Sequence, residues 1–299
     1  MLAPFHEYCK KTGVGMNWQR MAVFLLLAGM GIAQSCQAGA RQDGGTRYLR
    51  FSLGDREAYG ILEGDRVREI KGDLFGTWEK TETTHALADV TILVPSRNPS
   101  KVLALAGNYK SHLDEDAEPS PHPQPFIKLP SSLLRQGGEI VQPSDTDPVH
   151  YEAEVVVVIG KRARNVSKEA ALDHVLGITC GNDISARTWQ RGDVQWWRAK
   201  GADTFSPTGP YILSGVDYSR LKMVLKLNGE VRQQARVSDM IHGISETVSF
   251  ISRYVTLEPG DLIFTGTPGT TKGMQPGDVV TVEIDGVGVL ENRVVAAKP

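Results

Sequence analysis

Two glutamates stand at the start of the most valine-rich stretch of the sequence. Glu152 and Glu154 precede or open residues 155–159, and side chains two positions apart in a β-strand point to the same face of a sheet. Two carboxylates beside a buried strand are costly unless a cation neutralises them. A Glu-x-Glu pair on its own is more often a solvated strand face, so the pair predicts either a cation site or an exposed strand.

A third carboxylate follows another apolar segment. Asp183 comes directly after residues 177–182, which are typical of a buried strand. Considered alone, an aspartate here is more often the cap of a helix over residues 185–191, but it can also join Glu152 and Glu154 as a ligand. Three oxygen ligands favour a hard ion, Mg²⁺ or Mn²⁺ with Ca²⁺ as a further candidate, over zinc.

Three further residues have the chemistry of acid–base catalysis and charge stabilisation. His112 and Glu115 are three residues apart, a spacing that places both on one face of a helical turn. A carboxylate bonded to an imidazole raises its basicity, as activation of water requires. Lys200 lies in a loop with glycine and proline at residues 199–207 and can pair with a substrate carboxylate or enolate. The alternative for each is an exposed, solvated side chain.

The elements that must position these residues are mostly strands. Alternating apolar residues over 47–70 predict a small β-meander, and residues 279–286 predict a hairpin. A helix is expected after Ser167, carrying Ala171 and Val175 on one side, and another after Ser245. Strands and helices do not alternate regularly, so we expect an α+β, sheet-dominated fold.

We expect three segments along the chain. Residues 1–40 form a secretory signal segment, 41–98 a small amino-terminal β domain with a poorly periodic connection over 72–98, and 99–299 the catalytic domain. The signal is indicated by basic residues, a short apolar run over 21–32 and small residues at 38–40. We therefore expect export to the periplasm, or a cytoplasmic product if translation starts downstream.

Composition restricts the partners. With 40% hydrophobic and 23% charged residues, the sequence is that of a globular protein with a sizeable core. The formal net charge is -2, and no lysine- or arginine-rich run is present. A nucleic-acid partner is therefore not expected.

The residues above recur in an order that resembles the fumarylacetoacetate hydrolase family over about 101–295. The motifs are Gly107-Asn108-Tyr109-x-x-His112-x-x-Glu115, Pro125-Phe126-x-Lys128, Glu152-x-Glu154, Gly181-Asn182-Asp183-x-Ser185-x-Arg187, Lys200-x-x-Asp203-x-Phe205-x-Pro207 and Thr265-Gly266-Thr267-Pro268. The resemblance implies a mixed β-sandwich roll, a homodimer and a small-molecule 2-oxo or dicarbonyl acid as substrate.

The resemblance also implies roles for individual residues. Glu152, Glu154 and Asp183 match the ligands of a divalent ion, and His112 with Glu115 matches a pair on a mobile segment that closes over the substrate. Lys200 matches a lysine that steadies an enolate. The positions that match substrate-binding residues are Tyr109, Lys128, Arg187, Gln190 and Thr267. The segment between Glu115 and Phe126 departs from the family in being rich in proline.

The expected reaction is hydrolysis of a C–C bond in an acylpyruvate-like acid, with His112 and Glu115 activating water and an ion polarising the carbonyl. The same enolate without water attack serves a 2-oxo acid decarboxylase or a keto–enol isomerase. A ureidoglycolate-type lyase is a further alternative. A non-catalytic exported protein that binds a metal or solute is the alternative outside enzymes.

Overall fold

The structure of the protein, a computed structural model, describes residues 45–298. The expected signal segment, residues 1–40, lies outside the described residues, and export stays a prediction. Within residues 45–298, no helix combines the length and the apolar character needed to cross a membrane.

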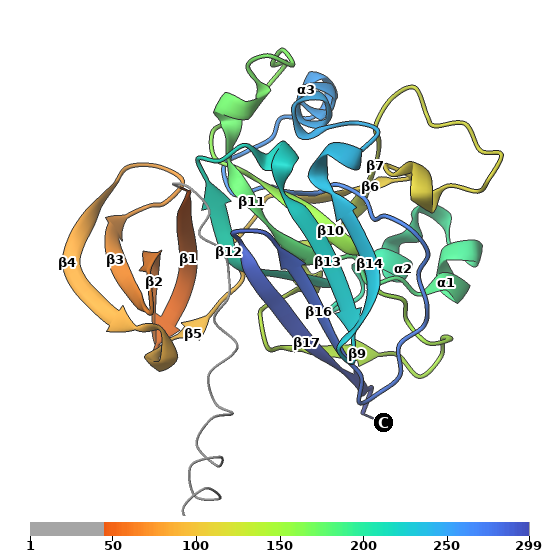
Figure 1. Ribbon diagram of the computed structural model, residues 1–299, viewed down its shortest axis with the longest axis horizontal. Coiled ribbons are helices and arrows are strands. Elements are labelled where there is room, and N and C mark those ends of the chain that lie inside the picture. Colours follow the sequence, from red (N-terminus) through yellow and green to blue (C-terminus); the bar gives the residue numbers. More distant parts are fainter. Residues whose placement is uncertain (1–44, 299) are drawn as a thin grey trace, which may run out of the picture. The chain divides into compact units, whose positions relative to one another are not determined.

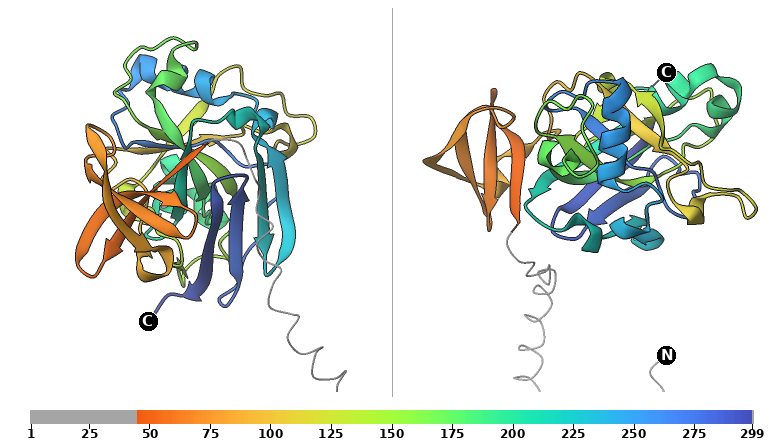
Figure 2. Two further views of the ribbon diagram at one scale, coloured as in Figure 1. Left: turned by 60° about the vertical axis from the view of Figure 1, so that its left-hand side comes forward. Right: turned by 90° about the horizontal axis from the view of Figure 1, so that it is seen from above.

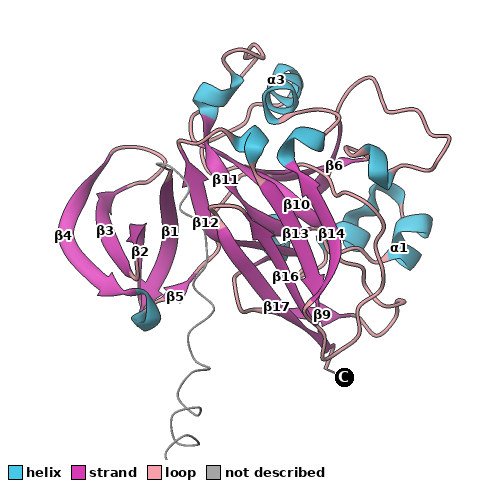
Figure 3. Ribbon diagram, in the orientation of Figure 1, coloured by secondary structure: helices cyan, strands magenta, loops and turns pink. Residues whose placement is uncertain are grey.

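Strands dominate the fold, as expected (Figure 3). They are β1 Thr46–Leu53, β2 Arg56–Glu63, β3 Arg66–Gly72, β4 Trp78–Ala86, β5 Thr91–Ile92, β6 Val102–Ala106, β7 Gln124–Lys128, β8 Leu133–Leu134, β9 Glu139–Gln142, β10 Ala153–Ile159, β11 Val175–Asn182, β12 Ser206–Ser214, β13 Lys222–Leu227, β14 Glu230–Arg236, β15 Leu262–Phe264, β16 Val279–Ile284 and β17 Gly288–Ala296.

The helices are short. They are the α-helices α1 Arg187–Gly192, α2 Trp197–Gly201 and α3 Ile244–Tyr254, and the 3-10 helices η2 Leu87–Asp89, η3 Lys110–His112, η4 Pro130–Ser132, η5 Ala171–His174, η6 Val194–Trp196, η7 Tyr218–Arg220 and η8 Val237–Asp239.

The strands form two sheets (Figure 1). The larger has twelve strands in the order β4-β3-β2-β1-β12-β11-β10-β15-β6-β7, with β5 paired to β1 and β8 to β12. The smaller has the order β14-β13-β16-β17-β9. Figure 2 shows the two sheets from two further directions. The result is the sheet-dominated α+β fold predicted from the sequence.

Strand β10 is buried on both faces, which explains its unbroken run of valines. Val155 and Val157 belong to an apolar core that also contains side chains of β13 and β16 in the smaller sheet. Val156 and Val158 pack on the other side, in a cluster with residues of β6 and β15. Because β10 lies between two apolar layers, any charge near its start is held in a water-poor environment.

The amino-terminal strands correct one expectation. Residues 72–98 are not only a connection, because β4 lies within them and pairs with β3. It carries no hydrophobic alternation since its side chains are mostly exposed or half-buried. β1 pairs with β12, so the larger sheet continues across the expected domain boundary at residue 98, and that boundary stays a prediction.

The helix expected after Ser167 is also wrong in extent. Only η5 forms there, and Val175 begins β11, where it pairs with Ile159 of β10. Sheet pairing therefore outweighs the local helical pattern. The later helix, α3, is present but starts after Gly243, so Ser245 lies inside it instead of capping it.

Candidate active site

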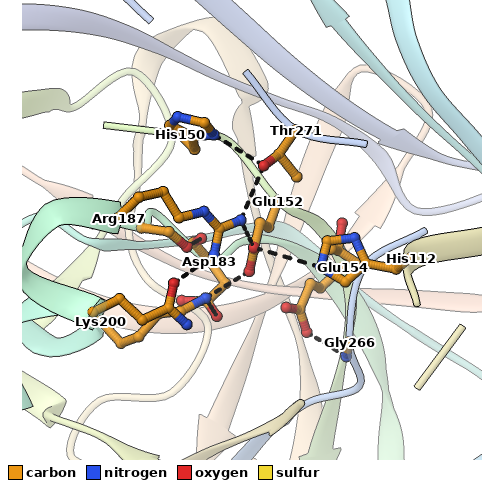
Figure 4. A network of polar contacts seen from close by, with 12 residues as sticks. His112, His150, Glu152, Glu154, Asp183, Arg187, Lys200, Gly266 and Thr271 are labelled. Atoms are coloured by element: carbon orange, nitrogen blue, oxygen red, sulfur yellow. Dashed lines mark hydrogen bonds and ion pairs between the residues drawn. The ribbon is translucent and has the colours of Figure 1, made fainter. Parts of the chain in front are cut away.

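The carboxylates of Glu152, Glu154 and Asp183 meet where β10 begins and β11 ends (Figure 4). The two strands are antiparallel, and the backbone N–H of Asp183 donates to the carbonyl of Glu152 at 2.8 Å. All three side chains are buried, and one oxygen of each lies within 4.8 Å of the others. The structure thus brings together the three carboxylates proposed from the sequence.

A glycine allows the carboxylate-bearing strands to lie this close. Gly181 pairs with Glu154 across β10 and β11. A Cβ atom at Gly181 would lie 2.3 Å from Val156 Cγ2 and 2.7 Å from Phe264 Cε1. A larger residue would therefore require these side chains or the strand to shift, next to the carboxylate cluster.

Two buried lysines contact the carboxylates. Lys200 Nζ donates to Glu152 Oε2 at 2.6 Å and to Asp183 Oδ2 at 2.7 Å. Lys128 Nζ donates to Asp183 Oδ1 at 2.5 Å, to the Phe205 carbonyl at 3.2 Å and to the Lys200 carbonyl. An ammonium has three donors, so all those of Lys128 are used. We therefore assign Lys128 to holding Asp183 in place, and not to the substrate contact expected from the sequence.

Arg187 is the third cation that contacts the carboxylate cluster, and like Lys200 it bonds Glu152. Its Nη2 donates to Glu152 Oε1 and, at 2.9 Å, to Thr271 Oγ1, while Nη1 donates to Gln190 Oε1 at 2.7 Å. Both Arg187 and Gln190 lie on α1, which begins just after β11. The helix therefore carries two of the expected substrate-binding residues to the edge of the carboxylate cluster.

The two glutamates have opposite protonation behaviour. Burial raises the pKa of Glu152, but Lys200 and Arg187 outweigh it and lower the pKa to about 2. Burial raises the pKa of Glu154 well above its ordinary value, and the charges of Asp183 and Glu152 raise it further. Glu154 is therefore the carboxylate whose charge is least compensated by the protein.

This imbalance fits a divalent cation. Glu154 accepts a hydrogen bond at 2.5 Å from the backbone N–H of Gly266, and within residues 45–298 it has no ion pair with a basic side chain. A buried carboxylate without a counter-charge is costly, and a bound cation would remove that cost. The donor set is all oxygen, so the residues fit a hard ion such as Mg²⁺ or Mn²⁺.

His112 lies beside the carboxylates with a defined tautomer. Its Nδ1 is 2.5 Å from the carbonyl oxygen of Gly269, and its Nε2 is 4.0 Å from Glu152 Oε1. A carbonyl only accepts hydrogen bonds, so Nδ1 carries the proton and Nε2 of the neutral ring is the basic nitrogen. The base faces the site.

The expected partner of His112 is not in place. Glu115 is exposed and makes no hydrogen bond or ion pair with His112 in the described chain. The reason is local: η3 ends at His112, and the chain leaves helical geometry at Leu113. The three-residue spacing therefore does not bring the two side chains onto one helical face.

The remaining expected substrate-binding residues are buried. Tyr109 is only 1% exposed, and within residues 45–298 its hydroxyl has no hydrogen-bond partner. Burial, followed by the charge of Glu154, raises the pKa of that hydroxyl. Thr267 Oγ1 accepts a hydrogen bond from Gln233 Nε2 at 2.9 Å. Within residues 45–298 the Tyr109 hydroxyl thus has an unused proton to donate, and the Thr267 hydroxyl, which accepts from Gln233, also retains its own proton as a donor.

Two residues near the carboxylate cluster, His150 and Thr271, were not identified from the sequence. His150 Nδ1 lies 3.0 Å from Thr271 Oγ1, and Thr271 in turn contacts Arg187. Burial and then the charge of Arg187 lower the pKa of His150. The two-residue alternation that singled out Glu152 extends back to His150 and could have found it. Thr271 carries no such signal, because it comes to the site on a loop.

Comparison with known proteins identifies relatives over most of the chain. The family model described as Fumarylacetoacetate (FAA) hydrolase C-terminal matches residues 101–295, and that described as Rv2993c-like, N-terminal matches residues 46–95. Protein Rv2993c of Mycobacterium tuberculosis is 40% identical over 260 residues, which cover 83% of this chain and 98% of that protein.

Two other relatives have names that state an activity. Oxaloacetate tautomerase FAHD2A, mitochondrial, from Bos taurus is 38% identical over 221 residues, covering 70% of each chain. The crystal structure of 2-hydroxyhepta-2,4-diene-1,7-dioate isomerase from Mycobacterium marinum is 39% identical, with a TM-score of 0.78. It covers 85% of this chain and all of that one.

Proposed function

This chain belongs to the fumarylacetoacetate hydrolase family, whose members include hydrolases, isomerases and tautomerases, and we propose that it too is an enzyme. The proposed reaction forms the enolate of a small 2-oxo or 1,3-dicarbonyl acid with the help of a divalent cation. Keto–enol isomerisation is the reaction that its site supports best. The observation that carries this proposal is His112, whose basic Nε2 faces the carboxylate cluster.

The divalent cation, when bound by Glu152, Glu154 and Asp183, would act as a Lewis acid toward the substrate carbonyl. His112 Nε2 would take a proton from the carbon beside that carbonyl and deliver it to the enolate oxygen, or move it in the reverse direction, and these two transfers complete a keto–enol exchange. Lys200 carries a positive charge at the same place, since Asp183 and Glu152 raise its pKa against the lowering effect of burial. That charge stabilises a developing enolate oxygen.

Hydrolysis of a C–C bond, the reaction expected from the sequence, is the second candidate. It needs the same base to activate water, and the 4.0 Å between His112 Nε2 and Glu152 Oε1 is too long for a direct hydrogen bond that would occupy this nitrogen. It also calls for Glu115 to strengthen His112, and Glu115 does not contact it. This difference places isomerisation first.

A rate assay tests the proposal. The protein is stripped with EDTA, reloaded with Mg²⁺ or Mn²⁺, and mixed with the enol form of oxaloacetate and with 2,4-dioxo acids. Loss of enol absorbance reports isomerisation, and chromatography of the products reports C–C cleavage. We expect a metal-dependent loss of enol absorbance without cleavage.

The variants separate the roles. His112→Ala should lower the isomerisation rate by about 10²-fold or more, as typical for loss of a general base. His174→Ala should not, because within residues 45–298 the ring of His174 hydrogen-bonds just the Arg162 carbonyl, away from the carboxylates. Glu115→Gln should matter only if cleavage occurs. Full isomerisation by His112→Ala would refute the role of His112, and ion and oxalate binding with no turnover would favour a non-catalytic binding protein.

We also propose that the protein forms the homodimer expected from the family resemblance. β7 is the last strand of the larger sheet, and apolar side chains on it and nearby are exposed: Ile127 by 65%, Leu129 by 40% and Trp197 by 61%. A sheet edge with such side chains is suited to pairing with another chain. Light scattering of the purified protein gives the mass directly.

A further inference from the structure

Arg187 differs from the two lysines that contact the carboxylates. Its side chain is 22% exposed, whereas those of Lys128 and Lys200 are 0% and 3% exposed. Arg187 is therefore the most exposed of these three cations and the one most accessible to an anionic group that enters from solvent. A guanidinium can bind a carboxylate through two parallel N–H groups, which suits the acid proposed as substrate.

The Nη2 group of Arg187 is held by two acceptors of different kinds. One is Glu152 Oε1, which belongs to the proposed cation site, and the other is Thr271 Oγ1 at 2.9 Å, which does not. Thr271 is held in turn by His150 Nδ1 at 3.0 Å (Figure 4). Arg187 can only donate, so the oxygen of Thr271 accepts from it whichever tautomer His150 adopts.

A divalent ion on Glu152 acts on only one of these two bonds. Both oxygens of Glu152 already accept from cations, Oε2 from Lys200 at 2.6 Å and Oε1 from Arg187. A divalent ion held by Glu152 would therefore compete with these cations, and its charge would repel the guanidinium and weaken the bond between Arg187 and Glu152. The hydroxyl of Thr271 is neutral and lies outside the group of three carboxylates, so its bond to Arg187 would be retained.

We propose that Thr271 is a positioning residue that keeps Arg187 beside the site when a cation occupies Glu152, so that the guanidinium meets the carboxylate of the substrate. The inference rests on the proposed function, because it supposes both a cation on Glu152 and an anionic substrate. Thr271 acts through Arg187, and its loss should weaken the binding of the acid without weakening that of the ion.

Calorimetry on matched variants tests the proposal. Thr271→Val keeps the shape of the side chain and removes the hydroxyl, Thr271→Ser keeps the hydroxyl, and Thr188→Val removes an exposed hydroxyl from α1 that contacts Asp147. Mn²⁺ is titrated first, and oxalate is then titrated at saturating Mn²⁺. Thermal unfolding of each variant reports whether the fold is intact.

We expect the Mn²⁺ affinity to be the same in all four proteins. Oxalate affinity should fall about tenfold in Thr271→Val, as for a lost hydrogen bond to a charged group, and should be kept in Thr271→Ser and Thr188→Val. Equal oxalate affinity in Thr271→Val and the unchanged protein would overturn the inference. So would equal losses in Thr271→Val and Thr271→Ser.

The same titrations distinguish this inference from the function on which it rests. If the unchanged protein binds Mn²⁺ and oxalate but Thr271→Val behaves identically, only the role of Thr271 is wrong. If the unchanged protein does not bind Mn²⁺, the proposed function is wrong and the role of Thr271 is refuted with it.

Discussion

The carboxylate cluster and the amino-terminal strands contain the same kinds of charged side chains in opposite surroundings. In the cluster, Lys200 bonds Glu152 at 2.6 Å with both side chains almost fully buried. On β2 and β3, Arg56 bonds Glu69 at 2.6 and 2.8 Å, but the Arg56 side chain is 52% exposed. The bond lengths are nearly the same.

The difference in burial decides what each pair does. An exposed pair exchanges its partner for water at little cost. A buried charge that loses its partner cannot be solvated by water instead, so removal of the partner is strongly destabilising. The amino-terminal pairs therefore contribute to a solvated surface, while the cluster holds a group of charges that depend on one another and can accept a cation.

The largest expected effect is on the buried side of this comparison. Lys128→Met removes three hydrogen bonds and leaves Asp183 with one cation fewer in a dry environment. We expect the free energy of unfolding to fall by about 3–5 kcal/mol, measured by urea denaturation. Lys71→Met, at a 78% exposed lysine, is the matched control and should leave the midpoint unchanged. Equal small effects of both changes would show that burial does not distinguish the two regions.

An intermediate effect is expected from pH in the metal-free protein. The folded-state pKa of Glu154 is raised by burial, then by Asp183 and Glu152, so its contribution to stability is full below the ordinary carboxyl pKa and is lost as the pH rises through the raised value. Glu152, with its pKa lowered to about 2, behaves oppositely: its contribution is present above the ordinary carboxyl pKa and is lost as the pH falls toward 2.

The unfolding temperature measured as a function of pH reports both losses of stability, the one from Glu154 as the pH rises and the one from Glu152 as the pH falls. Glu154→Gln should remove the loss of stability on the neutral side and keep the loss in acid, and saturating Mg²⁺ should have a similar effect on the neutral side. Glu82→Gln, at a fully exposed glutamate, is the control. If Glu154→Gln still lost stability as the pH rises toward neutral, that loss would belong to the titration of another group.

The smallest expected effect is on the exposed side. Arg56→Met breaks both bonds to Glu69, yet it should change the free energy of unfolding by less than about 1 kcal/mol, because water replaces the guanidinium. Urea denaturation in low and high salt measures this change in the free energy of unfolding. A loss as large as that of Lys128→Met would remove the contrast between the two regions.

Much of the architecture could be predicted because its signals are local. The valine run of β10, the hairpin of β16 and β17 and the meander of β1 to β3 all follow from periodicity and turn residues. β4 could not be predicted, because an exposed strand needs no apolar alternation. The start of β11 at Val175 was missed since it depends on pairing with Ile159 of β10, and a local helical pattern does not report that pairing.

The site was predictable to the same degree. Strand alternation alone predicts that Glu152 and Glu154 share a face. The place of Asp183 after an apolar segment also suits a helix cap, so its grouping with the glutamates came from the family resemblance. The use of all three Lys128 donors inside the protein, the separation of Glu115 from His112, and the contact of Thr271 with Arg187 depend on tertiary packing. No spacing in the sequence reports these.

The most direct test of the account is calorimetric titration of Mn²⁺ into the EDTA-treated protein and its Glu154→Gln variant, with Glu82→Gln as the control. Glutamine keeps the shape of the side chain and an oxygen to accept the bond from Gly266, but it has no charge for an ion. We predict about one ion per chain in the unchanged protein and the control, and at least a tenfold loss of affinity in Glu154→Gln. Equal Mn²⁺ affinity in all three proteins would contradict a cation site at the ends of β10 and β11.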